Sequence, residues 1–251
     1  MKKAKMALAK GNANTALDLA GQAIAEDPND DKCYLLRGTA YELLQRHTEA
    51  IQDFDKAIAL NPKAAEAYDR RGSEHFKLGH IRKSIDNFDK FLDLRPEAKP
   101  GHWKRGISYY YAGRFDDGRK QFEAYQTVDQ SDVENAVWRF LCMARAVGVD
   151  KARADMLKVG PDPRVPMMRI YSLFRGQAKP DDVLDAVRQG DPKEEELNQR
   201  LFYAHLYLGL YFEVQGDKKK ALDHLAATEK LKTGGYMGDV ARVHRALLEK
   251  Q

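Results

Sequence analysis

Cysteine is scarce in this chain, which holds only Cys33 and Cys142 among its 251 residues. A disulfide framework or a zinc site needs more ligands at closer spacing than these two provide. Both cysteines stand within apolar patterns of helical period, so we expect two buried free thiols. The number of cysteines therefore does not indicate whether the chain resides in a reducing or an oxidising compartment.

Long apolar runs are absent as well, since none reaches the ~18 residues of a helix that spans a bilayer. The N-terminal sequence MKKAKMALAKGN is basic but lacks the apolar stretch of a signal peptide. With 43% hydrophobic and 32% charged residues, the composition indicates a folded, helix-rich chain and argues against disorder.

A strong excess of one charge is also missing. The formal net charge is +4, too small to indicate nucleic acid as a partner. Lysines do cluster at Lys2, Lys3 and Lys5 and again at 218–220, and both clusters are typical of solvated helix ends. We therefore expect no nucleic-acid partner.

Motifs that carry catalysis are missing too. The stretch WKRGISYYYAGRFDDGRKQF, residues 103–122, holds three glycines, but their spacing matches neither a Walker A loop nor a dinucleotide fingerprint. No G-x-S-x-G elbow occurs, and His75 and His80 stand five apart without the glutamate of a zincin. Paired carboxylates such as Asp116 and Asp117 fit helix starts. We expect a chain that is not an enzyme and that holds no cofactor and no metal.

What the sequence does contain is a repeat of 34 residues, the distance between Pro28, Pro62 and Pro96. The same residue types recur at the same distances around each proline. Glycines, alanines and aromatic residues in matching places are Tyr34, Gly38, Tyr41, Ala50, Phe54 and Ala57, then Tyr68, Gly72, Gly79, Ser84, Phe88 and Phe91, then Gly106, Tyr109, Gly113, Gly118, Phe122 and Tyr125. This pattern resembles the tetratricopeptide repeat (TPR), a pair of antiparallel helices.

Each recurring residue has a physical role in such a pair. Gly38 allows close approach of the first helix to the second, and Phe54 fills the space between repeats. Gly79 stands where the turn needs a positive φ, and Pro62 ends a second helix. Because no single pair buries its apolar faces alone, neighbours stack. We predict an all-α, right-handed superhelical solenoid of about seven antiparallel helix pairs plus a C-terminal capping helix.

The regularity of the repeat divides the chain into three parts. Residues 1–132 read as four regular TPR units, residues 133–200 as degenerate TPR-like helices interrupted by prolines, and residues 201–251 as a C-terminal unit and capping helix. We expect one continuous superhelix, with a sharp kink or a sub-domain boundary near Gly160 as the alternative.

The first unit reads as truncated, because the 34-residue phase starts its first helix several residues before Met1. Either the chain is trimmed at its N-terminus or this first helix is short, as the end of a solenoid tolerates.

Beyond the generic repeat, the order KRGISYYYAGR, VENAVWRFLCMAR, a degenerate middle and FYAHLYLGLYFEVQGD is similar to the bacterial NlpI-type TPR lipoproteins. This resemblance implies an exported or periplasmic, membrane-associated adaptor that forms homodimers and brings proteases or cell-wall hydrolases to their substrates. The chain departs from the family because it has no lipobox cysteine near Met1. Membrane anchoring therefore requires that a lipid anchor was removed, and the chain is cytoplasmic if no signal precedes Met1.

The resemblance to TPR proteins also predicts where partners bind, because their concave inner wall comes mainly from the first helix of each pair. Projecting the repeat places candidate partner-binding residues in equivalent positions of successive helices. They are Leu35, Asp69, Phe76, Trp103, Ile107, Tyr110, Tyr111, Trp138, Arg145, Tyr203, Leu206 and Leu210. A clamp for terminal carboxylates needs Lys, Arg and Asn along this wall, so the chain is not expected to capture chaperone tails.

Trp103 and Trp138, the only tryptophans, fall at equivalent positions of adjacent helices. One interpretation is a paired aromatic ledge that anchors an apolar peptide or a second copy of the chain. The alternative is that both rings are buried by tightening of the superhelix in the degenerate middle. Tyr110 and Tyr111 are likewise unexplained by the repeat and face either a partner or a neighbouring helix.

The leading hypothesis is a non-enzymatic adaptor that binds protein or peptide segments in its groove and self-associates as a homodimer. One alternative is an RNA-binding helical-repeat protein, which predicts a continuous row of Lys and Arg where the projected wall is mixed and aromatic. A second alternative is a regulatory subunit of an enzyme complex, which the sequence does not separate from a free adaptor.

Overall fold

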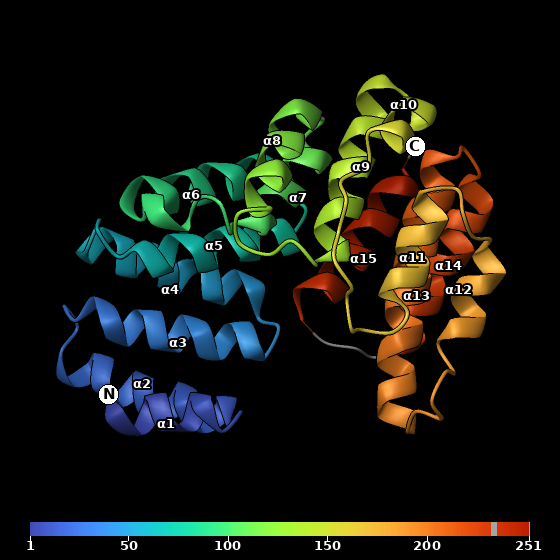
Figure 1. The fold of residues 1–251 in the computed structure, drawn as a ribbon. Helices are drawn as coiled ribbons and strands as arrows, with labels where there is room; N and C mark the ends of the chain where they lie inside the picture. The colour runs from blue at the N-terminus through green and yellow to red at the C-terminus, as the bar shows by residue number, and fades with distance from the viewer. Residues whose placement is uncertain (232–234, 251) are drawn as a thin grey trace. The chain divides into compact units, whose positions relative to one another are not determined.

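A computed structural model describes residues 1–231 and 235–250 (Figure 1). Helices are the only regular secondary structure in the described part of the chain. None of these helices is both long and apolar enough to cross a bilayer. The chain divides into two compact units, Met1–Lys99 and Pro100–Gln251. The division follows Lys99, and Gly160 lies inside the second unit.

The first unit consists of three antiparallel helix pairs in sequence, each helix packed on the next. Its elements are α1 (Lys2–Ala9), α2 (Ala13–Glu26), α3 (Asp31–Leu43), α4 (His47–Leu60), α5 (Ala65–Lys77), α6 (Ile81–Leu94) and the short 3-10 helix η1 (Pro96–Ala98). The pairs follow the 34-residue period, which confirms the predicted assignment of first and second helices. In the first pair, α1 is shorter than α3 and α5.

The packing predicted for the recurring glycines and phenylalanines is present. A Cβ placed on Gly38 would lie 2.6 Å from the ring of Phe54, and one on Gly72 would lie 2.8 Å from the ring of Phe88. Both rings are fully buried. Gly79 has a φ of +74°, which a residue with a Cβ rarely adopts. The glycines therefore hold the two helices of a pair at contact distance.

The second unit begins with the same kind of pair and then becomes irregular. Its helices are α7 (Trp103–Tyr111), α8 (Phe115–Tyr125), α9 (Val133–Val147), α10 (Val149–Ala154), α11 (Met167–Phe174), α12 (Pro180–Ala186), α13 (Glu194–Val214), α14 (Lys218–Lys230) and α15 (Tyr236–Leu248). The shortened α10 is followed by a non-helical segment, 155–166, that contains the three predicted proline interruptions. The degenerate middle is therefore helical, and within it α10, α11 and α12 are shorter than the α-helices from α2 to α8 whereas α9 is not.

Both cysteines are buried free thiols, as predicted. Burial raises the pKa of Cys33 to about 11 and that of Cys142 to about 12. Cys142 lies in α9 at the contact with α8, where its sulfur would be 2.8 Å from a Cβ on Gly118. Its small side chain thus serves helix packing.

Candidate interaction surfaces

The first unit carries a groove formed by the first helices of its three pairs, with a volume of about 690 Å³. Apolar side chains of α1 and α3 contribute Leu8, Leu35 and Leu36, and residues at the start of α5 close the groove. The lining residues are Lys5, Leu8, Asp31, Lys32, Leu35, Leu36, Thr39, Lys63, Ala64, Ala65, Glu66, Arg70, Leu94 and Arg95.

Positive charge predominates in this groove, which five basic and two acidic residues line. Lys5, Lys32 and Lys63 are exposed and make no ion pair within the described residues. Arg70, in contrast, is paired with Glu42 and Glu66, both at 2.9 Å. The three lysines are therefore available to an incoming negative group.

The structure places Leu35 in this groove, as the repeat predicted. Asp69 does not line it, and the neighbouring Arg70 does. Phe76 lies in a stretch, Gly72–Lys77, that is buried on every side of α5. Its ring is part of the core, so the expectation that Phe76 is available to a partner is wrong.

The inner wall of the second unit is closed where the repeat predicted an open groove. Ile107, Tyr110, Leu206 and Leu210 are all buried. They are buried because α13 lies close to α7 and α9. Glu213 of α13 accepts a hydrogen bond of 3.1 Å from Tyr110 of α7 and forms an ion pair of 2.8 Å with Arg145 of α9. Burial therefore contradicts the prediction that these four residues contact a partner. Arg145, in contrast, is exposed.

The last helix, α15, covers more than the last repeat. It packs on α14 as a cap, as predicted, and two of its side chains contact α7. The hydroxyl of Tyr111 lies 3.1 Å from Nδ1 of His244, and the ring of Tyr236 meets Trp103 edge to face at 5.2 Å. Tyr111 therefore faces a neighbouring helix of its own chain.

The two tryptophans have different environments. Trp138 is 2% exposed and packs against the rings of Phe122 and Tyr110. Trp103 is only half-buried and lines a pocket. The predicted paired ledge is therefore absent, because burial of Trp138 leaves Trp103 as the accessible member of the pair.

This pocket, which we call the aromatic pocket, has a volume of about 250 Å³ and lies within the second unit. Aromatic rings and carboxylates make up most of its lining. The lining residues are Trp103, Ile107, Phe122, Tyr125, Asp132, Glu134, Asn135, Trp138, Arg164, Tyr203 and Met237. The repeat predicted four of these residues, Trp103, Ile107, Trp138 and Tyr203. It did not predict the charged residues, because Asp132 and Glu134 at the start of α9 and Arg164 in the segment before α11 fall where the 34-residue pattern has no signal.

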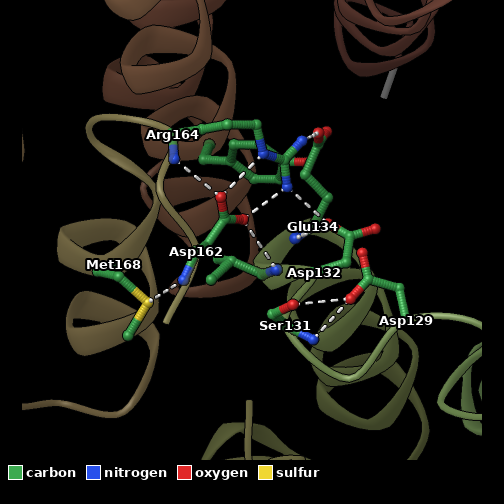
Figure 2. A network of polar contacts seen from close by, with 9 residues as sticks. Asp129, Ser131, Asp132, Glu134, Asp162, Arg164 and Met168 are labelled. Atoms are coloured by element: carbon green, nitrogen blue, oxygen red, sulfur yellow. Dashed lines mark hydrogen bonds and ion pairs between the residues drawn. The ribbon is translucent and has the colours of Figure 1, made fainter. Parts of the chain in front are cut away.

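Arg164 connects the carboxylates around the pocket (Figure 2). Its guanidinium lies 2.7 Å from Asp132, 2.7 Å from Glu134 and 2.6 Å from Asp162. Burial raises the pKa of Glu134, although hydrogen bonds from Tyr207 and Arg164 oppose this shift. The network ties the segment before α11 to the N-terminus of α9 and leaves carboxylates in excess.

Two buried polar atoms of pocket-lining residues have no hydrogen-bond partner within the described chain, Oδ1 of Asn135 and Nε1 of Trp138. The amide group of Asn135 is oriented by its Nδ2, which donates to the carbonyl oxygen of Phe122 at 2.9 Å. Groups of three or more His, Cys, Asp or Glu residues arranged to hold a metal are absent from the described residues.

Comparison with known sequences identifies the repeat. Residues 32–64 and 70–133 match the profiles of the tetratricopeptide repeat, so the chain contains TPR repeats in these segments. A search of curated proteins returned no significant match.

Solved structures show the same fold at low sequence identity. A tetratricopeptide repeat protein from Parabacteroides merdae is 15% identical, with 99% of this chain and 96% of that chain covered and a TM-score of 0.62. The C-terminal part of a TPR repeat-containing protein from Cytophaga hutchinsonii is 18% identical, with coverages of 95% and 98% and a TM-score of 0.59. The protein MamA is 22% identical, with coverages of 61% and 89% and a TM-score of 0.56. These likenesses confirm the all-α fold of TPR helix pairs.

Proposed function

We propose that this chain is a non-catalytic protein-interaction scaffold and that the groove of its first unit binds an acidic peptide segment with apolar side chains. The observation that carries the proposal is the placement of three unpaired lysines, Lys5, Lys32 and Lys63, around the leucines of a groove. TPR repeats form a stacked scaffold whose inner helices present an extended binding surface.

The composition of the groove favours a protein segment over RNA. Leu8 and Leu35, which are partly exposed, offer an apolar surface on which a partner's aliphatic or aromatic side chain gains affinity by burial. None of the described residues that line the groove is aromatic, so the groove offers no ring on which the bases of single-stranded RNA could stack. Lysines at the rim add charge complementarity and speed association with acidic segments.

The proposal is tested by fluorescence anisotropy with a labelled peptide that alternates Asp or Glu with Leu. Lys32→Glu and Lys63→Glu should each weaken binding about tenfold, and affinity should fall as salt increases. Lys90→Glu, on the outer helix α6, is the matched control because it makes the same charge change outside the groove.

Several outcomes would contradict this assignment. Equal loss of affinity in Lys90→Glu means that net charge alone governs binding. Tighter binding of oligouridine than of the acidic peptide assigns the groove to RNA. If the Leu35→Ala variant binds the peptide as tightly as the parent chain, Leu35 is not an apolar anchor for the peptide.

In its finer form, the proposal is an NlpI-like adaptor that self-associates and brings envelope proteases or hydrolases to substrates. What supports it is the order of sequence features from KRGISYYYAGR to FYAHLYLGLYFEVQGD. Sedimentation equilibrium at micromolar concentration should give twice the monomer mass of 28.6 kDa. A monomer over the whole concentration range removes the homodimer from this proposal.

A further inference from the structure

We propose that the aromatic pocket of the second unit binds a basic side chain, lysine or arginine, presented by a partner protein. This site lies in a different unit from the acidic-peptide groove and has the opposite charge preference. The scaffold would then have two sites that select partner segments of opposite sign.

Three aromatic rings contribute to the accessible lining of the pocket. Trp103, Tyr125 and Tyr203 are partly exposed in the pocket, with Phe122 buried behind them. A cation over such rings is attracted by their negative faces, and the attraction increases when the site is partly shielded from water.

The edge of this aromatic cluster already accommodates one ammonium group. Nζ of Lys104 lies 5.7 Å from the centre of the Tyr236 ring, and Tyr236 in turn meets Trp103 edge to face. A cation of the same kind on the pocket side of Trp103 would extend an arrangement that the chain itself makes.

Electrostatics favour a positive occupant. Asp132, Glu134 and Asp162 are three carboxylates that share one guanidinium, that of Arg164. The network therefore has an excess of two negative charges, and an excess of one remains when Lys104 is counted. Because the side chains of Asp132 and Glu134 are only 18% and 15% exposed, water screens this excess less than at an open surface.

The pocket also offers an acceptor and a suitable size. Oδ1 of Asn135 lacks a partner, and an ammonium or guanidinium N–H is the kind of donor that would satisfy it. The volume of about 250 Å³ falls below the ~300–1,000 Å³ of ordinary small-molecule sites. A single long side chain of a partner fits this volume better than a cofactor.

The test uses five peptides, acetyl-Gly-Ser-X-Ser-Gly-amide, in which X is lysine, arginine, trimethyllysine, norleucine or glutamate. Binding is followed on the indole N–H signals of the nitrogen-15 labelled full chain by NMR. The two tryptophans give two signals, which a Trp103→Phe variant assigns. Lysine, arginine and trimethyllysine peptides should shift the Trp103 signal and bind at least tenfold more tightly than the norleucine peptide.

Two variants and two controls locate the site. Trp103→Leu should weaken the cationic peptides at least tenfold, and Asp132→Asn should weaken them several-fold. Asparagine can still accept the N-cap hydrogen bond that Asp132 receives from the backbone N–H of Glu134, so α9 keeps its start. Asp116→Asn, in the exposed first turn of α8, is the matched charge control. Lys32→Glu should change acidic-peptide binding only, so that failure at one site is distinguished from failure at the other.

The proposal is overturned if norleucine binds as well as lysine, because the pocket is then merely apolar. It is equally overturned if glutamate binds best, if no cationic peptide shifts the Trp103 signal at 10 mM, or if Trp103→Leu binds like the parent chain while its helical circular dichroism is unchanged.

Discussion

Arg139 on α9 donates a hydrogen bond of 2.6 Å to Asp155, sixteen residues further along the chain. Arg37 stands in the same relation to Asp53 at 2.7 Å, and Arg105 in the same relation to Gln121. Arg71 completes the series with Asn87 at 2.7 Å. These four arginines are 34 residues apart and each connects the two helices of its own pair.

The connection at Arg139 shows that the degenerate pair keeps the geometry of the regular ones. Helix α10 ends at Ala154, and Asp155 follows it directly. Arg139 also donates a hydrogen bond of 2.9 Å to Glu123 of α8, so it links α8 and α9 to the residue that follows α10. A signal for this series was present in the sequence, because an arginine precedes the packing position in four successive first helices, α3, α5, α7 and α9.

Removing one of these arginines should destabilise the first unit. Asp53 is 7% exposed at its side chain and receives two hydrogen bonds from Arg37. Arg37→Met therefore leaves a buried carboxylate without its partner, which we expect to cost about 2 kcal/mol. The estimate is below that for a fully buried pair because Arg37 is 28% exposed. Urea unfolding measures the loss of stability. The control is Arg46→Met, which removes an exposed ion pair with Glu49 and should change stability by less than ~0.5 kcal/mol.

Glycines at the helix contacts should not tolerate a methyl group. Gly38→Ala places a Cβ 2.6 Å from the buried ring of Phe54, so the ring or the helix must shift, at a cost of about 1–3 kcal/mol. Gly21→Ala is the control, because nothing lies within 4 Å of that Cβ and alanine favours the helix by ~0.5–1 kcal/mol. Thermal melting of the two variants should move in opposite directions. Two equal melting temperatures would contradict the close approach.

Acid should destabilise the second unit through His244. Burial, and secondarily Arg145, lowers the pKa of this imidazole to about 4, from about 6.5 in an unfolded chain. Below pH ~6.5 the unfolded state binds a proton that the folded state does not bind. Stability is therefore lost as the pH falls from ~6.5 to ~4, by roughly 3 kcal/mol for this group.

The measurement is thermal or urea unfolding at pH 7 and pH 5. His244→Gln should flatten the profile relative to the parent chain. His205 contributes in the same direction because burial also lowers its pKa to about 4. An unchanged profile in His244→Gln would rule out this residue as a source of acid sensitivity.

Ionic quenchers should separate the two tryptophans. In a Trp138→Phe variant the fluorescence comes from Trp103 alone, which stands beside the carboxylates of the aromatic pocket. Caesium should quench it more strongly than iodide, because the local charge attracts cations. In Trp103→Phe, the buried Trp138 should respond to neither ion. Preferential quenching of Trp103 by iodide would contradict the excess of negative charge.

Local chemistry at a fixed period was sufficient to predict the helix pairs. The contact of Gly38 with Phe54, the positive φ at Gly79 and the prolines after the first three pairs are all features local to one unit of the repeat, so the 34-residue spacing already contains them. The placement of Leu35 in a groove follows from the same periodicity.

What only the tertiary structure decided is which inner-wall residues stay accessible. Tyr110, Leu206 and Leu210 are buried because Glu213 and α15 come close to helices roughly 100 residues earlier, and no repeat spacing encodes such a contact. Likewise, Arg164 reaches Asp132 from a non-helical segment about 30 residues later. Long-range packing therefore determined that Trp138 is core and that Trp103 is the tryptophan beside an acidic pocket.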